Sequence, residues 1–245
     1  MELGGHTVLV TGGASGIGFG LAEQFVQASS TVIICGRRED KLREAQAKYP
    51  QLHIRACNLA VPQERVALFE WATNQFPPLN VLVNNAGIQQ RFQLQQPPAW
   101  ETIHDEIAIN IDAPIHLSTL FIPHLLKQQQ AYILNVSSGL AFSPLAFTPV
   151  YSATKAAVHS FTLSLRHQLS GTPITVIEII PPSVDTDLGG VGLHTSGTPL
   201  PEYINSVVEQ LKAGSLETSY GFSAQSSRAS REQLDELFKR MNQRR

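Results

Sequence analysis

Tyr151 and Lys155 are the two side chains in this sequence whose types and spacing most clearly suggest chemistry. They stand four residues apart in a segment with helical character, so on a helix both lie on one face, about one turn apart. A free phenol has a pKa near 10 and is a poor acid or base at neutral pH. An ammonium group about 4 Å away would attract the phenolate by roughly 4 kcal/mol at an effective dielectric of about 20, which lowers the phenol pKa. The pair predicts proton transfer, although alone it also fits a buried tyrosine beside a solvated lysine.

A glycine-rich turn near the N-terminus is the second chemical feature. Thr7–Val10 predicts a short buried strand, Thr11–Gly18 is rich in glycine, and the apolar spacing from Ile17 to Val26 predicts a helix. A strand, a glycine turn and a helix in this order direct backbone N–H groups and a helix N-terminus at phosphate. The turn therefore predicts a dinucleotide site, and an ordinary strand-to-helix connection is the alternative.

The elements that must position these residues alternate along the chain. The predicted strands are Val8–Val10, Thr31–Cys35, His53–Ala56, Val81–Val83, Tyr132–Val136 and Thr175–Ile180, and the predicted helices lie near 16–28, 39–48, 62–76, 98–127 and 150–170. This alternation predicts an α/β fold, a single Rossmann-type doubly wound parallel sheet of about seven strands with helices on both faces. No change in composition marks a boundary, so we predict one domain over residues 1–245.

Composition excludes several classes of protein. The 245 residues are 42% hydrophobic and 16% charged, which is typical of a globular domain with a sizeable core. The net charge of −2 gives no reason to expect a nucleic-acid partner. No apolar stretch approaches the roughly 18 residues of a membrane span, and the N-terminus lacks the features of a signal peptide, so we predict no membrane association and a cytoplasmic location. Cys35 and Cys57 predict buried, reduced thiols, and the eight histidines show no metal-ligand spacing, so no metal site is predicted.

Polar groups follow four of the predicted strands. The turn Thr11–Gly18 follows the first, Gly36–Arg38 the second, Asn84–Gly87 the fourth and Asn135–Gly139 the fifth. In a doubly wound sheet, ligands bind at the carboxyl ends of the strands beside the topological switch point. These groups, with the helix that carries Tyr151, therefore predict a single site at one edge of the sheet.

The motifs together resemble those of the short-chain dehydrogenase/reductase family. Thr11–Gly18 matches the cofactor motif, Asn84–Gly87 the fourth-strand motif and Tyr151-x-x-x-Lys155 the active-site motif. The likeness covers about residues 5 to 190. A further likeness in three segments points to the DltE-like bacterial oxidoreductases; these segments are Cys35–Asp40, Ser138–Phe142 and Phe238–Asn242.

The resemblance implies hydride transfer between a nicotinamide and a carbonyl or alcohol carbon. The implied catalytic residues are Ser138, Tyr151, Lys155 and Asn110. Tyr151 would move the proton, Lys155 would lower its pKa and bind the nicotinamide ribose, and Asn110 would hold a water that links Lys155 to solvent. Ser138 would hydrogen-bond the substrate oxygen. A turn-capping serine is the alternative, which Ser137 fits better than Ser138.

The resemblance also implies a set of cofactor contacts, which are Gly12, Ser15, Gly16, Ile17, Gly18, Arg37, Arg38, Asn58, Leu59, Asn84, Ala86, Gly87, Tyr151, Lys155, Pro181, Val184 and Thr186. NAD binders of this type carry an acidic residue at the end of the second strand, where this chain has Gly36 followed by two arginines. Arginine suits a 2′-phosphate, so we predict NADP(H), with NAD(H) possible; the alternative is that both arginines begin a solvated helix. Thr186 either contacts the nicotinamide carboxamide or caps a helix.

The sequence identifies the substrate only coarsely. Gly139–Val150 is apolar, and the glycine-rich stretch that begins at Leu188 predicts a mobile substrate loop near 187–213. Both predict a pocket for a small apolar carbonyl or alcohol, unless their apolar residues are subunit contacts. Gln89–Pro98 predicts a surface loop, and residues near 229–243 predict an amphipathic C-terminal helix. The resemblance implies a homodimer or homotetramer built on the helices near 98–127 and 150–170.

Two functions remain open from the sequence. The first is an NADP(H)-dependent carbonyl reductase or alcohol dehydrogenase. The second is a non-catalytic NADP(H) sensor on the same fold. A sensor needs the glycine turn but not the proton-transfer set of Asn110, Ser138, Tyr151 and Lys155, so the sequence favours the enzyme.

Overall fold

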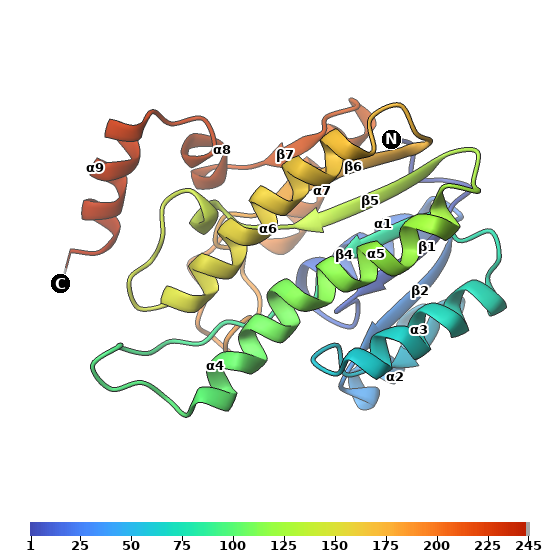
Figure 1. Cartoon of the computed structure of the whole chain (residues 1–245), viewed down its shortest axis with the longest axis horizontal. Helices are drawn as coiled ribbons and strands as arrows, with labels where there is room; N and C mark the ends of the chain where they lie inside the picture. Colours follow the sequence, from blue (N-terminus) through green and yellow to red (C-terminus); the bar gives the residue numbers. More distant parts are fainter. Residues whose placement is uncertain (244–245) are drawn as a thin grey trace.

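The computed structural model describes residues 1–243, and its strands form a seven-stranded parallel sheet in the order β3-β2-β1-β4-β5-β6-β7 (Figure 1). The strands are β1 (Thr7–Thr11), β2 (Thr31–Gly36), β3 (His53–Ala56), β4 (Val81–Asn84), β5 (Ala131–Val136), β6 (Ile174–Ile180) and β7 (Glu217–Ser219). The order reverses between β1 and β4, which makes the carboxyl ends of these two strands the topological switch point. The predicted doubly wound α/β sheet is confirmed.

Helices cover both faces of the sheet because successive strand residues point to opposite sides. Val8 and Val10 pack under α1 (Gly16–Gln27), α2 (Glu39–Lys48) and α7 (Leu200–Lys212). Leu9 between them packs under α3 (Pro62–Gln75), α5 (Ala113–Leu125) and α6 (Pro149–Gln168). Two apolar layers therefore hold the strands, and their ends, in fixed positions.

The segment predicted as one helix near 98–127 is not a regular helix. It consists of α4 (Trp100–Ile107), a π-helical turn (Ala108–Asp112) and α5. A π-turn adds one residue to a helical turn and is frequent at functional sites. Asn110 lies in this turn, with its side chain buried. The predicted helical stretch is confirmed, while the single inserted residue was not foreseen, because apolar spacing cannot reveal it.

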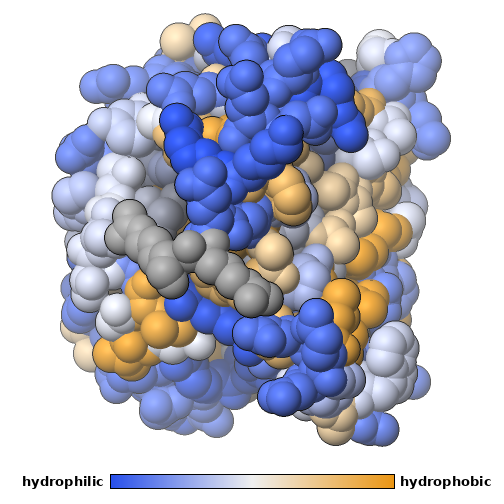
Figure 2. All heavy atoms as spheres, turned by 90° about the vertical axis from the view of Figure 1, so that its left-hand side faces the viewer, coloured by the Kyte–Doolittle hydropathy of each residue, from blue (hydrophilic) through white to orange (hydrophobic). Residues whose placement is uncertain are grey.

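The C-terminal part folds over the carboxyl edge of the sheet. It contains α8 (Phe222–Ser226) and α9 (Arg231–Met241), which matches the helix expected near 229–243. Asn242 fastens α9 to the loop before α6, because its Oδ1 accepts from the Ala146 N–H at 2.6 Å and its Nδ2 donates to the Pro144 carbonyl at 3.0 Å. Hydrophilic residues cover much of the face of the molecule in Figure 2, and apolar side chains emerge there in patches.

The structure corrects the predicted bounds of the substrate loop and confirms the prediction for the two cysteines. The second half of the loop expected near 187–213 is α7, whose residues Tyr203, Val207 and Leu211 are buried, so the irregular part ends before Leu200. Cys35 and Cys57 are free and buried, as predicted, and burial raises the pKa of Cys57 to about 11. Within residues 1–243 no helix is long and apolar enough to cross a bilayer, and no His, Cys, Asp and Glu cluster could hold a metal ion.

Candidate active site

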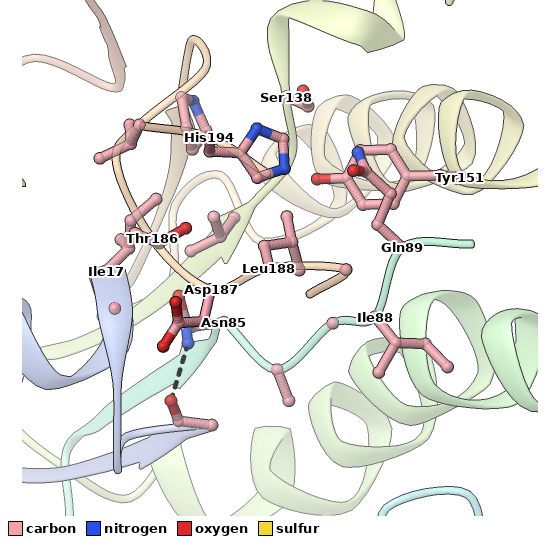
Figure 3. A pocket seen from close by; sticks show the side chains of 18 of the residues that line it. Ile17, Asn85, Ile88, Gln89, Ser138, Tyr151, Thr186, Asp187, Leu188 and His194 are labelled. Carbon is pink, nitrogen blue, oxygen red and sulfur yellow. Dashed lines mark hydrogen bonds between the residues drawn. The ribbon is translucent and has the colours of Figure 1, made fainter. Parts of the chain in front are cut away.

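A cavity of about 720 Å³ opens at the carboxyl edge of the sheet. Its wall includes Gly12 after β1, Gly36 at the end of β2, Ala86 after β4, Ser137 after β5 and Pro181 after β6. The strand ends that the sequence predicted to converge therefore do so. The cavity runs from the glycine turn at one end to Tyr151 and the loop around His194 at the other (Figure 3).

The glycine turn has the geometry that a dinucleotide phosphate requires. Gly12 (φ 62°) and Gly16 (φ 53°) adopt the left-handed conformation that favours glycine. A Cβ on Gly12 would stand 2.9 Å from Ala86 Cα, and the amide of Asn85 donates to the Gly12 carbonyl at 3.3 Å (Figure 3). Ser15, the N-cap of α1, makes no side-chain capping bond. The N–H groups at the start of α1 are thus left for an anion, which is how a pyrophosphate would fit.

The end of β2 presents two arginines to the cavity wall. Arg37 and Arg38 are exposed, and among the described residues neither forms an ion pair. The neighbouring carboxylate, Glu39, is held by Arg43 at 2.6 Å. The guanidinium groups are therefore free for a phosphate. Arg38 is also the N-cap residue of α2. The alternative prediction, that the arginines begin a solvated helix, therefore holds for the backbone of Arg38.

Most residues predicted for the cofactor line this cavity. They are Gly12, Ser15, Gly16, Ile17, Arg37, Arg38, Leu59, Ala86, Gly87, Tyr151, Lys155, Pro181, Val184 and Thr186. Thr186 lies in a loop and no helix begins there, so the alternative of helix capping was wrong. A Cβ placed on Gly16 would stand only 3.3 Å from Thr186 Cγ2. The loop after β6 therefore packs closely against the glycine turn.

Three predicted cofactor residues lie behind the wall and support it. A Cβ on Gly18 would stand 2.5 Å from the Gly12 carbonyl, so Gly18 lets α1 pack against the turn. The amide of Asn84 donates to Ser118 Oγ and to Asn135 Oδ1 at 3.1 and 2.9 Å, inside the core. The side chain of Asn58 accepts from the Ala60 N–H at 3.2 Å and does not line the cavity.

Tyr151, Lys155 and Ser138 line the other end of the cavity. Tyr151 is 6% and Lys155 4% exposed. The Lys155 ammonium donates to the Val136 carbonyl at 2.8 Å and lies 5.6 Å from the centre of the Tyr151 ring. Ser138 accepts from the Leu140 N–H at 3.1 Å, so it caps the turn that Ser137 was expected to cap.

The expected lowering of the Tyr151 pKa by Lys155 was wrong for this structure. Burial raises the Tyr151 pKa well above its usual range; a hydrogen bond with Ser138 lowers it, and the charge of Glu106 raises it further. Burial also lowers the pKa of Lys155 to about 8. The ammonium faces a backbone carbonyl, and the loss of water around both groups outweighs their attraction.

Asn110 holds the strand-end loop in place from the π-turn. Its Oδ1 accepts from the Ile88 N–H and its Nδ2 donates to the Ile88 carbonyl, both at 2.9 Å. Nδ2 also donates to Thr154 Oγ1 at 3.1 Å, which ties the loop to the helix of Tyr151. A Cβ on Gly87 would stand 3.3 Å from Asn110 Oδ1 and 3.6 Å from Lys155 Nζ. The predicted water between Asn110 and Lys155 stays a prediction.

Sequence reasoning missed several residues at the Tyr151 end. Gln89 was assigned to a surface loop but is only 8% exposed and lines the cavity, as do His194, Phe222 and Met241. Glu106 is fully buried near Tyr151. His194 lies within the substrate loop expected near 187–213 but was not singled out, and Glu106 stands one helical turn before Asn110.

Comparison with known proteins agrees with this geometry. The profile of the short chain dehydrogenase family matches residues 6–192. The chain is 46% identical over 248 residues to a Bacillus subtilis protein named "Uncharacterized oxidoreductase DltE", covering 99% of this chain and 98% of the other. A short-chain dehydrogenase from Sphingobium yanoikuyae in complex with NADPH shares the fold with a TM-score of 0.81 at 24% identity, covering 95% and 91% of the two chains. A short chain dehydrogenase/reductase from Burkholderia phymatum in complex with NAD has a TM-score of 0.81 at 19% identity, covering 89% and 90%.

Proposed function

The chain belongs to the short-chain dehydrogenase family, an NAD(P)-dependent group of dehydrogenases and reductases, and from that premise we propose its reaction. We propose that it transfers a hydride between NADP(H) and the carbonyl or secondary alcohol of a small substrate, with Tyr151 as general acid and base. The observation that carries this proposal is the shared cavity. Tyr151, Ser138 and Lys155 line the same space as the glycine turn and the two arginines.

The roles follow from the positions of the three side chains. The nicotinamide supplies or accepts the hydride when it is bound. In reduction, Tyr151 gives its phenolic proton to the carbonyl oxygen, and Ser138 hydrogen-bonds the same oxygen. A phenol is already protonated at neutral pH, so Tyr151 has a proton to give, and the hydrogen bond with Ser138, which lowers its pKa, favours release of that proton. Lys155, with a pKa lowered to about 8, is still mostly charged at neutral pH and is oriented by the Val136 carbonyl.

Preference for NADP(H) rests on the end of β2. A free 2′-phosphate needs cationic partners and no competing carboxylate, and Arg37 and Arg38 line the wall while Glu39 is paired with Arg43. NAD(H) fits the same turn, and the two solved structures compared above hold NADPH and NAD, respectively. The preference is therefore one of degree.

The substrate end favours a small molecule with apolar parts. Leu140, Leu145, Leu188, Phe222 and Met241 supply apolar wall there. We propose a cytoplasmic enzyme that forms a homodimer or homotetramer. The exposed side chains of Trp100 on α4 and Leu163 on α6 support an interface on those helices.

A cofactor titration and a turnover assay test the reaction together. NADPH and NADH binding is measured by fluorescence, and a panel of ketones and aldehydes is then followed by NADPH consumption. We expect Tyr151→Phe to lose at least about 100-fold in turnover, since a positioned acid contributes about 100- to 10,000-fold. Tyr49→Phe is the control, because Tyr49 packs on Phe19 at 6.1 Å outside the cavity.

Three outcomes would contradict parts of the proposal. Turnover above a few per cent of wild type in Tyr151→Phe would exclude Tyr151 as the acid. NADPH binding without turnover of any carbonyl would favour the non-catalytic sensor. Tighter binding of NADH than NADPH, unchanged in Arg37→Glu, would show that the arginines do not choose the cofactor.

A further inference from the structure

Two uncharged polar side chains lie at the Tyr151 end of the cavity without a role in the proposed reaction. They are Gln89, in the loop after β4, and His194, in the loop after β6. Figure 3 shows both directed toward Tyr151 from different sides of the cavity. Leu140, Leu145 and Leu188 supply apolar wall at this end, so Gln89 and His194 are candidates for holding a polar group of the substrate.

Gln89 is held on both sides by buried side chains. Asn110 binds the N–H and the carbonyl of Ile88, both at 2.9 Å. Glu106 accepts from the N–H of Gln90 at 3.0 Å. The backbone of Gln89 is thus fixed between two clamps, and its side chain, 8% exposed, is positioned before any ligand binds.

The amide end of Gln89 is unpaired within the described residues. Its Oε1 is buried without a hydrogen-bond partner. The opposite loop approaches so closely that a Cβ on Gly189 would stand 3.1 Å from the Gln89 carbonyl and 3.3 Å from Oε1. Gly189 has φ 76°, so the loop reaches Gln89 only with glycine there. A buried amide left unpaired is costly, which points to a ligand group as its partner.

His194 provides the second unpaired group. Its Nδ1 lies 3.2 Å from Ser183 Oγ, and its buried Nε2 meets no partner with hydrogen-bond geometry among residues 1–243, the Leu188 backbone giving the ring only a weaker contact. Burial lowers the His194 pKa and the charge of Arg91 lowers it further, against smaller opposing effects of the Leu188 carbonyl and Asp185. The ring is therefore neutral at pH 7 and offers a hydrogen bond without a charge.

We propose that Gln89 and His194 form a polar subsite for a second, uncharged oxygen of the substrate, so that the preferred substrates are ketones that carry a further hydroxyl or carbonyl group. This inference rests on the proposed function and narrows its substrate class. A buried carboxylate would need a cationic partner. Lys155 on the same wall is taken by the Val136 carbonyl, and Arg91 is exposed and lies over the Phe147 ring at 5.5 Å.

Affinity in a slow variant tests the subsite independently of turnover. The NADPH-loaded Tyr151→Phe protein is titrated with two matched pairs, butanone with acetoin and methyl butyl ketone with acetonylacetone, and binding is read by ligand-detected NMR. We expect the oxygenated member of at least one pair to bind about three- to tenfold more tightly, the value of one or two hydrogen bonds. Gln89→Leu and His194→Phe should each reduce that ratio toward one.

The control is Gln90→Leu, the same substitution one residue along, where the side chain does not line the cavity. Added to Tyr151→Phe, it should leave the affinity ratio of the oxygenated to the plain ketone unchanged. NADPH titration and thermal melting check that each variant is folded, and Gln89→Met replaces Gln89→Leu if the latter does not fold.

The proposal is overturned if neither oxygenated ketone is preferred, or if the preference survives both Gln89→Leu and His194→Phe. It is also overturned if levulinate binds most tightly and loses its advantage in Arg91→Ala alone, which would assign the subsite to a carboxylate. Expected affinity ratios without turnover by the wild-type protein would leave the subsite intact and reject the reaction instead. Turnover of carbonyl substrates without the expected affinity ratios would support the reaction and reject the subsite.

Discussion

Replacing Glu106 by glutamine should remove a pH-dependent penalty from the folded state. The Glu106 side chain is fully buried; one oxygen accepts from the Gln90 N–H at 3.0 Å and the other has no partner among the described residues. Burial raises the pKa of this carboxyl from 4.5 to about 7, although the bond from Gln90 acts in the opposite direction. Glutamine has nearly the same shape, keeps an oxygen for the Gln90 N–H and does not titrate.

The sign follows from where the proton is bound. Below pH 4.5 the carboxyl is protonated in both the folded and the unfolded chain. Between pH 4.5 and about 7 the unfolded chain ionises while the folded chain keeps its proton, so the free energy of unfolding falls as pH rises. At 1.36 kcal/mol per pKa unit, the wild type should lose about 2–3 kcal/mol relative to Glu106→Gln between about pH 5 and pH 8.

Urea denaturation followed by circular dichroism measures this difference. Wild type and Glu106→Gln are compared at one protein concentration without cofactor, because oligomers and ligands shift apparent stability. Other titrating groups, such as His159 beside Glu178, cancel because both proteins contain them. Glu101→Gln, at an exposed position of the same helix, is the control and should follow the wild-type curve. Parallel pH profiles for wild type and Glu106→Gln would refute the reasoning.

Three further substitutions, the first with a matched control, test packing in and around the site. Gly18→Ala would place a Cβ 2.3 Å from the Asn85 amide, so we expect a loss of about 1–3 kcal/mol in urea denaturation and weaker NADPH binding. Gly36→Ala, where a Cβ meets nothing within 4 Å, should change stability much less. Phe121→Ala removes a fully buried ring from the core under β1 and should cost about 3–5 kcal/mol, with an unchanged cofactor preference as its check. Asn242→Ala breaks two bonds to the loop before α6 and should speed amide exchange in α9, while a rate equal to wild type would show that the helix is held by other contacts.

The fold was readable from the sequence because its main signals are local. The central strands are short apolar runs, so the bounds of β1 to β6 were predicted within a residue or two. The helices between them were predicted from the spacing of their apolar residues. β7 was not, because only one residue of Glu217–Ser219 is buried and a three-residue edge strand has no pattern of its own. The π-turn at Asn110 was missed for a related reason. Besides its own backbone bond from the Ala113 N–H to the Ala108 carbonyl, it is held by bonds from Asn110 to Ile88, 22 positions earlier in the chain.

The two ends of the cavity differ in the same way. The cofactor end is built from a glycine turn and strand termini, whose residue types are required by backbone geometry and stand together in the sequence. The substrate end is assembled by contacts between distant segments, such as Gln89 with Gly189 and Asn242 with Ala146. No local pattern marks such contacts, and Gln89 therefore looked like part of an exposed polar loop.

Tyr151 shows how burial can reverse an argument based on spacing alone. A lysine one turn away lowers the pKa of a phenol when the attraction between its charge and the phenolate exceeds the cost of removing the phenolate from water. Here the ammonium of Lys155 is turned to the Val136 carbonyl and Tyr151 is 6% exposed, so burial dominates and the phenol keeps its proton. Glu106 acts in the same direction, since its negative charge raises the Tyr151 pKa further. Glu106, which accepts from the Gln90 N–H beside Gln89, thus also raises the pKa of Tyr151, and it does so above about pH 7, where its own carboxyl is ionised.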